Sequence, residues 1–318
     1  MGYVAIKDIK AGMQFSGLEV LVKSFETKPM QKKKQDYGTG YFEDVTGTIS
    51  FKAWESDVVD VLKAGAVQGK VISIDGECTF SSYSNMLEIK ITGVRGEVEG
   101  YNPDNYIRSC DIEGNRGKFN KLVNEHLSEP YAKALMVVLG QPLTDEKEGN
   151  LFSEFKVEQA AHSVHDALKG GLMNHTLKMC NIANVLIESD ERLKPYKDIL
   201  LISVILHDIG KVYEYDKGEK TNIGFVTHHV LGVEILAKVK DEVVKLIGEE
   251  SYYRILSVIQ GHHGEFGDRP TSIYAYIIHL IDMLDSKTTS IMSKIENKEY
   301  IQYGGNNCVK LDGYNLVI

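Results

Sequence analysis

Histidine and aspartate residues recur at the ends of apolar segments in the second part of the chain. The run ILLISVILHDIG (199–210) is apolar until His207 and Asp208, and polar groups at the end of a buried stretch need partners. Imidazole and carboxylate groups together suit Mn, Fe, Zn, Ni and Co ions. The candidate metal ligands lie on helix faces or at helix ends: His175, His207, Asp208, His228, His262, His263 and Asp282.

Such a ligand set suits phosphoryl chemistry, in which two ions about 3.5–4 Å apart share a bridging water that acts as nucleophile. One carboxylate that contacts both ions would hold them close, and Asp208 is the candidate for this bridge. A single buried histidine is more often a hydrogen-bonded core residue than a ligand. Two tandem pairs, 228–229 and 262–263, together with a His-Asp pair favour a metal site, whereas a structural role explains His229 or His279 equally well.

Two basic residues are candidates for contact with a phosphate. Lys211 lies four residues after His207, and we expect it to neutralise negative charge that develops during the reaction. The alternative is a solvated lysine near a helix C-terminus. Arg269 lies in the Gly-rich loop after the tandem histidines, and Gly264 and Gly267 could let this loop move over a substrate.

The elements that must position these residues are helices. From residue 118 to 300 the apolar residues recur at helical spacing, and glycines such as Gly210 and Gly264 fall where helices would end. Helical bundles build metal sites from inward-facing side chains of separate helices. We therefore predict an all-α bundle over residues 118–300, followed by a weakly patterned tail over residues 301–318 without an assigned role.

Residues 1–98 follow a different pattern. Short β-branched and aromatic runs punctuated by Gly, Asn and Asp predict about five strands, and ESDVVDVLKAG (55–65) predicts a helix between the third and the fourth. This order fits an OB-fold, a small all-β barrel, with any other small β domain as the alternative. Residues 99–117 lack sustained periodicity and predict a linker.

The first domain also offers basic and aromatic residues, which could bind a single-stranded nucleic acid by charge and stacking. Phe51 and Trp54 are an odd number of residues apart, so one should fill the barrel while the other is exposed. A solvated loop is the alternative explanation of the lysine run. The candidate nucleic-acid-binding residues are Lys32, Lys33, Lys34, Phe42 and Trp54.

The composition says more about the cellular location of the protein than about the kind of partner that it binds. The net charge of −9 argues at first against a polyanionic partner, but a segment rich in His and Asp can be acidic because it holds cations. The longest apolar run is far too short to span a membrane, and the first residues lack a signal-peptide core. Four widely spaced cysteines predict free thiols in a reducing compartment. We expect a cytoplasmic protein without membrane contact.

Five motifs occur in the order seen in the HD-domain metal-dependent phosphohydrolases, and the chain resembles this family. They are GGLMNHT, LHDIGKVYEY, HHVLG, GHHGEFGDRP and HLIDMLDSK. The tandem HH pair and His228 are similar to the two-metal members. An OB-like domain followed by an HD domain resembles the YhaM-type 3′→5′ exoribonucleases over nearly the whole chain. The expected architecture is therefore an OB-fold barrel followed by an all-α HD domain.

The resemblance implies a first set of metal ligands and a second set that completes another site. It implies Mn²⁺ as the activator, with Fe²⁺, Co²⁺ and Ni²⁺ as alternatives. It also implies release of nucleoside 5′-monophosphates from single-stranded RNA, with single-stranded DNA as an alternative substrate. One departure is Asp166, where such relatives should carry a second histidine, and this leaves the role of His165 in doubt. The implied ligands are His175, His207, Asp208 and Asp282 in the first set, and His228, His262 and His263 in the second.

Two other functions remain alternatives. An HD phosphodiesterase of a cyclic dinucleotide or small nucleotide would use the same ligands, but it would not need a strand-binding domain. A non-catalytic binding protein with a structural HD domain would hold a single strand without forming product. Assembly into a homo-oligomer is left open by the sequence.

Overall fold

Contacts within the chain divide it into two units, Met1–Arg108 and Ser109–Ile318, each with its own hydrophobic core. The division falls inside the segment predicted as a linker, 99–117. The computed structural model describes residues 2–30, 35–82, 86–107, 109–140, 150–160, 168–216, 219–264, 268–296 and 300–318.

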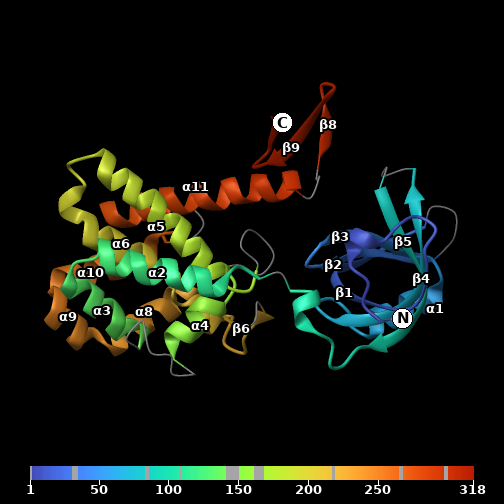
Figure 1. Ribbon diagram of the computed structural model, residues 1–318, viewed down its shortest axis with the longest axis horizontal. Coiled ribbons are helices and arrows are strands. Elements are labelled where there is room, and N and C mark those ends of the chain that lie inside the picture. The colour runs from blue at the N-terminus through green and yellow to red at the C-terminus, as the bar shows by residue number, and fades with distance from the viewer. Residues whose placement is uncertain are drawn as a thin grey trace. The chain divides into compact units, whose positions relative to one another are not determined.

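The first unit is a closed five-stranded barrel with the strand order β1–β2–β3–β5–β4 (Figure 1). α1 (Ser56–Ala64) connects β3 to β4, as the sequence predicts, and β3 pairs with β5 in parallel. This arrangement confirms the predicted OB-fold. The strands are β1 (Gln14–Pro29), β2 (Asp36–Asp44), β3 (Gly47–Ala53), β4 (Val71–Ser81) and β5 (Met86–Glu97), with short 3₁₀ helices η1 (Ile6–Asp8) and η2 (Pro103–Asn105) outside them.

The barrel closes because β1 is long enough to serve two neighbours. Its first part pairs with β4, and its second part pairs with β2. The β1–β4 register shifts between Ser16 and Leu18, where Gly17 has a φ of 74°. A glycine tolerates this left-handed conformation, and such a bulge bends the strand.

Side chains of β2 and β3 alternate between the barrel core and its outer surface. Phe42 and Phe51 are fully buried, with ring centroids 4.2 Å apart, whereas Tyr41 is 51% exposed and Trp54 is 37% exposed. The expectation that one of Phe51 and Trp54 fills the barrel is confirmed. The prediction that Phe42 contacts nucleic acid is wrong, because the two-residue period of β2 turns its ring inward and turns Tyr41 outward.

The second unit is a helical bundle, which confirms the predicted fold class (Figure 1). α6 and α11 contact each other, and both contact α5 and α10 around the core of the bundle; α8 also contacts α10. Its helices are α2 (Ile112–His126), α3 (Glu129–Leu139), α4 (Leu151–Val157), α5 (Gly171–Ser189), η3 (Lys194–Tyr196), α6 (Lys197–Leu206), α7 (Lys211–Glu214), α8 (His228–Lys238), α9 (Lys240–Ile247), α10 (Glu249–Gly261) and α11 (Ile273–Glu296), and its short strands are β6 (Tyr215–Asp216) and β7 (Glu219–Lys220).

α6 lies at the centre of this bundle. Every residue from Ile199 to Leu206 is buried, because the helix is apolar on all sides and is packed against α5, α10, α11 and α3. A buried central helix carries the residues at its C-terminal end into the interior. His207 and Asp208 are therefore almost inaccessible to solvent.

The two ends of the bundle differ from the sequence-based description. α2 begins at Ile112, so the last part of the predicted linker is helical. The predicted tail forms a three-stranded antiparallel sheet, β8 (Ile301–Tyr303), β9 (Asn306–Leu311) and β10 (Tyr314–Val317), with β9 in the middle. It is tied to α11 by an ion pair of 2.7 Å between Lys287 and Asp312. Among the described helices, none combines the length and apolarity that crossing a membrane requires.

Candidate metal centre

The seven predicted ligands come from five helices or their ends, and the structure brings them together. His175 lies in α5, His207 caps α6 and is followed by Asp208, and His228 begins α8. His262 caps the C-terminus of α10 and is followed by His263, and Asp282 lies in α11. All but His263 and Asp282 are buried.

Gly210 allows the turn after Asp208 to lie directly against α8. A Cβ atom on Gly210 would lie 2.0 Å from the carbonyl oxygen of His228 and 2.6 Å from the backbone nitrogen of Gly232. These are backbone atoms that cannot rotate away, so only glycine fits here. The motif HDIG thus places the end of α6 beside the first residue of α8.

One group of ligands surrounds Oδ2 of Asp208. The Nε2 atom of His207 lies 3.2 Å from this oxygen, and the Nε2 atom of His175 lies 3.9 Å from it. His175 Nε2 is also 3.4 Å from Oδ1 of Asp282. Ligands about 2.1 Å from a common ion lie about 3.4 Å apart in a tetrahedral arrangement, so these distances suit one metal ion.

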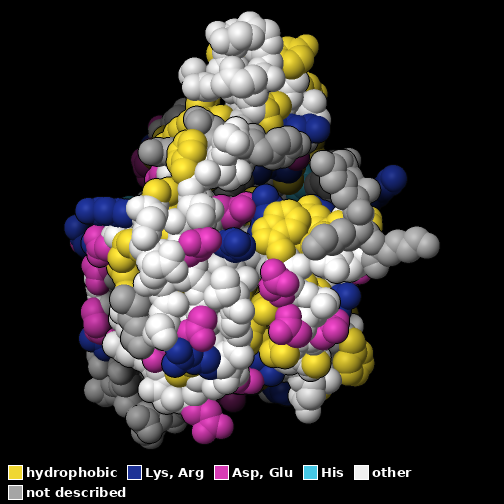
Figure 2. All heavy atoms as spheres, turned by 90° about the vertical axis from the view of Figure 1, so that its right-hand side faces the viewer, with side chains coloured by type: hydrophobic (Ala, Val, Ile, Leu, Met, Phe, Trp, Pro, Cys, Tyr) yellow, Lys and Arg dark blue, Asp and Glu magenta, His cyan; other side chains and the backbone are white. Residues whose placement is uncertain are grey.

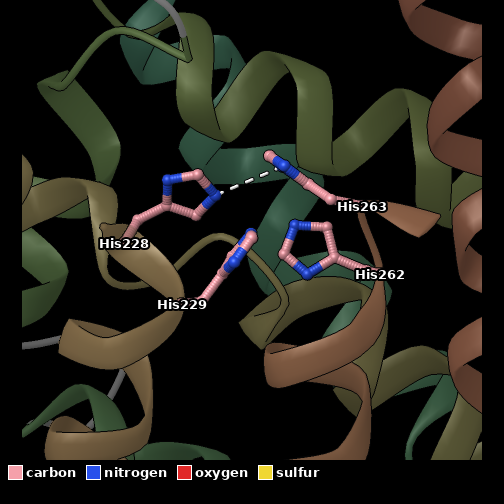
Figure 3. Close-up of side chains that lie close together, drawn as sticks. All are labelled: His228, His229, His262 and His263. Atoms are coloured by element: carbon pink, nitrogen blue, oxygen red, sulfur yellow. Dashed lines mark hydrogen bonds between the residues drawn. The ribbon is translucent and has the colours of Figure 1, made fainter. Parts of the chain in front are cut away.

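A second group surrounds the other oxygen of the same carboxylate. Oδ1 of Asp208 lies 3.4 Å from Nε2 of His228 and 3.4 Å from Nε2 of His262. The Nε2 atoms of His228 and His263 are 3.3 Å apart (Figure 3). Asp208 therefore presents one oxygen to each group, which is the geometry that a bridging carboxylate needs.

The Nδ1 atoms of four imidazoles are already engaged, which leaves their Nε2 atoms facing the centre. His175 donates to Asp285 (2.7 Å) and His228 donates to Glu214 (2.7 Å). His207 donates to the carbonyl oxygen of Val204 (2.7 Å), and His262 is 3.1 Å from the carbonyl oxygens of Val258 and Ile259. Hydrogen bonds of this kind fix the tautomer and orientation of metal-binding histidines.

Several atoms that face the centre have no hydrogen-bond partner among the described residues. They are Nε2 of His207, His229 and His262, and Oδ1 of Asp208, and all are buried. Buried polar atoms without partners are costly, and metal ions bound to the two groups would satisfy them. The residues therefore fit the divalent ions that the sequence predicts.

The charges of the first group are set by close contacts. Burial acts to lower the pKa of His175, but hydrogen bonds to Asp282 and Asp285 outweigh burial and raise the pKa to about 9. Burial acts to raise the pKa of Asp208, but Lys211 and the neighbouring histidine hold this pKa well below its ordinary value. Asp208 is thus ionised at neutral pH, as a metal ligand must be.

The histidines of the second group are neutral. Burial lowers the pKa of His228, His262 and His263 and lowers the pKa of His229 to about 4, and it outweighs the interactions with Asp208, which act to raise these pKa values. Neutral imidazoles keep a lone pair for a metal ion. The group is therefore ready to bind a cation at neutral pH.

The two predicted phosphate contacts differ in position. Nζ of Lys211 lies 2.6 Å from Oδ2 of Asp208, at the edge of the centre. Arg269 is exposed, and its backbone oxygen lies close to Gly261 of α10. No contact of its guanidinium group with the described ligands is present, so its role stays a prediction. Gly267 and the pair His165–Asp166 lie outside the described residues.

Two carboxylates of the centre were not predicted. Asp285 follows Asp282 by three residues, one helical turn, so helical spacing could have identified it. Glu214 has no comparable signal, because it is 14 residues from His228 and reaches the histidine only through the fold. His229 is not among the ligands predicted from the sequence, but it lies in the histidine cluster shown in Figure 3.

Of the remaining predicted residues, Trp54 lies at the surface of the barrel. The ring of Trp54 stacks on Tyr37 with centroids 4.7 Å apart, and Nζ of Lys52 lies 5.7 Å from the centroid of the Trp54 ring. This is a partly exposed aromatic pair with an adjacent cation. The three consecutive lysines, Lys32, Lys33 and Lys34, lie outside the described residues.

Comparison with known proteins agrees with this architecture. Residues 172–287 match the family model of the HD domain. The chain is 27% identical over 281 residues to the 3′-5′ exoribonuclease YhaM of Shouchella clausii, a match that covers 85% of this chain and 83% of the relative. A match of this length is longer than the second unit, so it includes part of the barrel. The predicted resemblance to YhaM-type HD-superfamily hydrolases is confirmed.

Two further similarities are each limited to part of the chain. The dihydroneopterin 2′,3′-cyclic phosphate phosphodiesterase of Methanocaldococcus jannaschii is 27% identical over 181 residues, which covers 55% of this chain and 70% of the relative. The second OB-fold domain of replication protein A from Methanococcus maripaludis matches 31% of this chain and 98% of that domain, at 15% identity and a TM-score of 0.23.

Proposed function

We propose that the chain is a metal-dependent 3′→5′ exoribonuclease that hydrolyses single-stranded RNA to nucleoside 5′-monophosphates. The observation that carries this proposal is the position of Asp208, whose two oxygens face two separate groups of imidazole and carboxylate ligands. The similarity to YhaM, which extends beyond the helical unit, supports RNA as the substrate class. Single-stranded DNA is an alternative substrate.

The residues of the chain have distinct proposed roles in phosphodiester hydrolysis. Two divalent ions, of which Mn²⁺ is the proposed activator, would supply Lewis-acid chemistry and lower the pKa of a bound water. Asp208 would contact both ions, and the remaining ligands of each group would hold one ion. Lys211 already has its ammonium group beside Asp208, where it can contact a phosphate oxygen that gains negative charge. Arg269 is the proposed second contact.

The barrel would hold the single strand through its outer surface over β2 and β3, which OB-folds use for oligonucleotides. Trp54 and Tyr37 provide a stacked aromatic platform, and Lys52 provides a nearby positive charge. Tyr41 replaces the buried Phe42 as the exposed ring of β2. On the face drawn in Figure 2, exposed hydrophobic side chains gather beside acidic and basic ones. Lys32, Lys33 and Lys34 remain proposed contacts.

A phosphodiesterase of a small cyclic or nucleotide substrate is the second candidate. The observation in its favour is the similarity to the Methanocaldococcus jannaschii phosphodiesterase, which has the same percentage identity as the YhaM match over a shorter segment. The same ligands could serve either substrate. The aromatic platform of the barrel has no evident use with a small substrate. A binding protein without catalysis is the third candidate.

The test is an assay with 5′-labelled single-stranded RNA and Mn²⁺. We expect a ladder that shortens from the 3′ end and ends in nucleoside 5′-monophosphates. EDTA and Asp208→Ala should each abolish it, since both remove the ions. Asp241→Ala, which changes an exposed aspartate in the first turn of α9, is the matched control and should leave the ladder intact.

Other products would support the other candidates. Internal cleavage, or hydrolysis of cyclic dinucleotides or cyclic phosphates without RNA degradation, would favour the small-substrate phosphodiesterase. RNA binding that survives EDTA, with no product at any metal concentration, would favour the binding protein.

A further inference from the structure

A fourth imidazole joins the second ligand group. The rings of His228, His229, His262 and His263 lie together in Figure 3, and each offers a nitrogen within 4.8 Å of the nitrogens of the others. The ring centroid of His229 is 4.3 Å from His228, 4.3 Å from His263 and 4.9 Å from His262. Its Nε2 atom is buried and has no partner among the described residues.

Neighbouring residues in a helix usually point in different directions, so the convergence of two adjacent pairs has a structural cause. His228 is the first residue of α8, and Thr227 before it is extended, with φ −68° and ψ 149°. His262 caps the end of α10, and His263 follows outside the helix. α8 and α10 are packed against each other, so the start of one helix meets the end of the other.

We propose that His229 is a ligand of the second metal ion, which is then held by four imidazoles and one oxygen of Asp208. The inference rests on the metal centre proposed above but does not depend on RNA as the substrate. The unpartnered Nε2 atom of His229 is the observation that points to an ion, because a purely structural histidine would find a hydrogen-bond partner when buried.

The two groups then differ in chemistry. The first contains two carboxylates, Asp208 and Asp282, with two imidazoles, whereas the second contains four imidazoles and shares only Asp208. Carboxylates suit Mn²⁺, and imidazoles suit ions such as Co²⁺, Ni²⁺ and Zn²⁺. A given site usually binds Co²⁺ more tightly than Mn²⁺, so we expect this difference in affinity to be larger in the second group than in the first.

The experiment titrates the metal-free protein with Co²⁺ and Mn²⁺, alone and in competition. Metal content is measured by mass spectrometry after gel filtration, and the visible absorption of Co²⁺ reports on its ligands. With one equivalent of Co²⁺ and an excess of Mn²⁺, the wild-type protein should retain one of each ion, with Co²⁺ in the second group. Omitting Co²⁺ should leave the second group more weakly filled than the first.

Three variants identify the role of His229. His229→Ala removes the ring, and His229→Phe keeps a flat ring without nitrogen, so that loss of packing can be separated from loss of a ligand. His126→Ala, in the last turn of α2, is the matched control. Both His229 variants should lower the affinity for Co²⁺ at least about tenfold and change its visible spectrum, since loss of an indirect support alone costs this much. Binding of Mn²⁺ to the first group should stay unchanged.

Two results would overturn the inference. One is a His229→Ala protein that binds Co²⁺ with wild-type affinity and spectrum, which would mean that His229 is not a ligand. The other is an equal loss of both ions in both His229 variants, which would mean that His229 supports the whole centre. These results are independent of RNA cleavage, so a failure of the proposed exoribonuclease activity would not be mistaken for a failure of this inference.

Discussion

Glu214 and Asp285 fix the orientation of two imidazoles from outside the ligand set. Glu214 accepts hydrogen bonds from both the backbone nitrogen (3.1 Å) and Nδ1 (2.7 Å) of His228, and Asp285 accepts one from His175. Each carboxylate also has a lysine partner, Lys220 at 3.4 Å for Glu214 and Lys178 at 3.2 Å for Asp285. The two ligand groups thus have matching supports, one for each.

Removing the charge of Glu214 should weaken the second ligand group. In Glu214→Gln the amide keeps the size of the side chain but loses the carboxylate, which makes His228 a poorer ligand. We expect the affinity for the second ion to fall about 10- to 100-fold, as is typical for such supporting residues. The first ion should be retained. Calorimetric titration of the metal-free protein measures the affinities for both ions.

Glu234→Gln is the matched control, because Glu234 is an exposed residue of the same helix, α8. If Glu214→Gln and Glu234→Gln bound both ions equally well, Glu214 would have no role in holding the metal. If Glu214→Gln lost both ions, its role would be general packing of the turn between α7 and α8.

At the scale of elements, the sequence predicts the helices whose boundaries and burial follow from a local pattern of apolar residues. The apolar run that becomes α6 has the length and composition of a buried helix, so its polar end at His207 and Asp208 could be assigned to a site. The helix between β3 and β4 was likewise predicted. The role of Glu214 could not be predicted, because its contact with His228 depends on how α7 meets α8 and not on the spacing of the two residues in the sequence.

Other elements were missed for identifiable reasons. The face of β2 was assigned wrongly because Tyr41 and Phe42 are adjacent aromatics, and only pairing with β3 determines which one enters the barrel. The sheet after residue 300 has short strands separated by turns at Gly304 and Gly313, and its strands are mostly exposed, so alternation of apolar residues is weak.

The close contact between the HDIG turn and α8 leads us to expect that a side chain at position 210 destabilises the protein. In Gly210→Ala the new methyl group would meet the backbone of His228 and Gly232, and the two segments would have to separate. We expect the free energy of unfolding to fall by about 2 kcal/mol, in the range of overpacked sites. Because this separation moves Asp208 away from His228, the metal content should fall as well.

Gly117→Ala provides the comparison for this substitution. Gly117 is exposed within α2, and a Cβ atom there would have nothing within 4 Å. Alanine favours helix more than glycine does, so this variant should be more stable by about 0.5–1 kcal/mol. Chemical denaturation of both variants gives the two values. Equal effects of the two substitutions would show that the turn at Gly210 tolerates a side chain.

At the scale of the whole molecule, the chain combines two units whose contributions can be measured separately. Each has its own core, and the metal ligands all belong to the second unit. A short phosphodiester such as bis(p-nitrophenyl) phosphate needs only the metal centre. A long single strand would also use the aromatic platform of the barrel. Activity on a short and on a long substrate therefore distinguishes the contribution of the metal centre from that of the barrel.

Trp54→Ala should therefore affect one substrate and spare the other. The loss of one stacking ring costs about 1–3 kcal/mol of binding to a base, so KM for a long single-stranded RNA should rise roughly 5- to 150-fold. Because the metal centre is unchanged, kcat/KM for bis(p-nitrophenyl) phosphate should equal that of the wild type. Steady-state kinetics with both substrates measures this difference.

The control for this substitution is Tyr314→Ala, which removes an exposed ring from β10 of the second unit. It should leave both substrates unaffected, since the proposed strand-binding surface lies on β2 and β3. A Trp54→Ala protein with unchanged KM for RNA would exclude the Trp54–Tyr37 pair as a stacking platform. If both substrates were affected equally, the barrel would act on the stability of the protein and not on the capture of the strand.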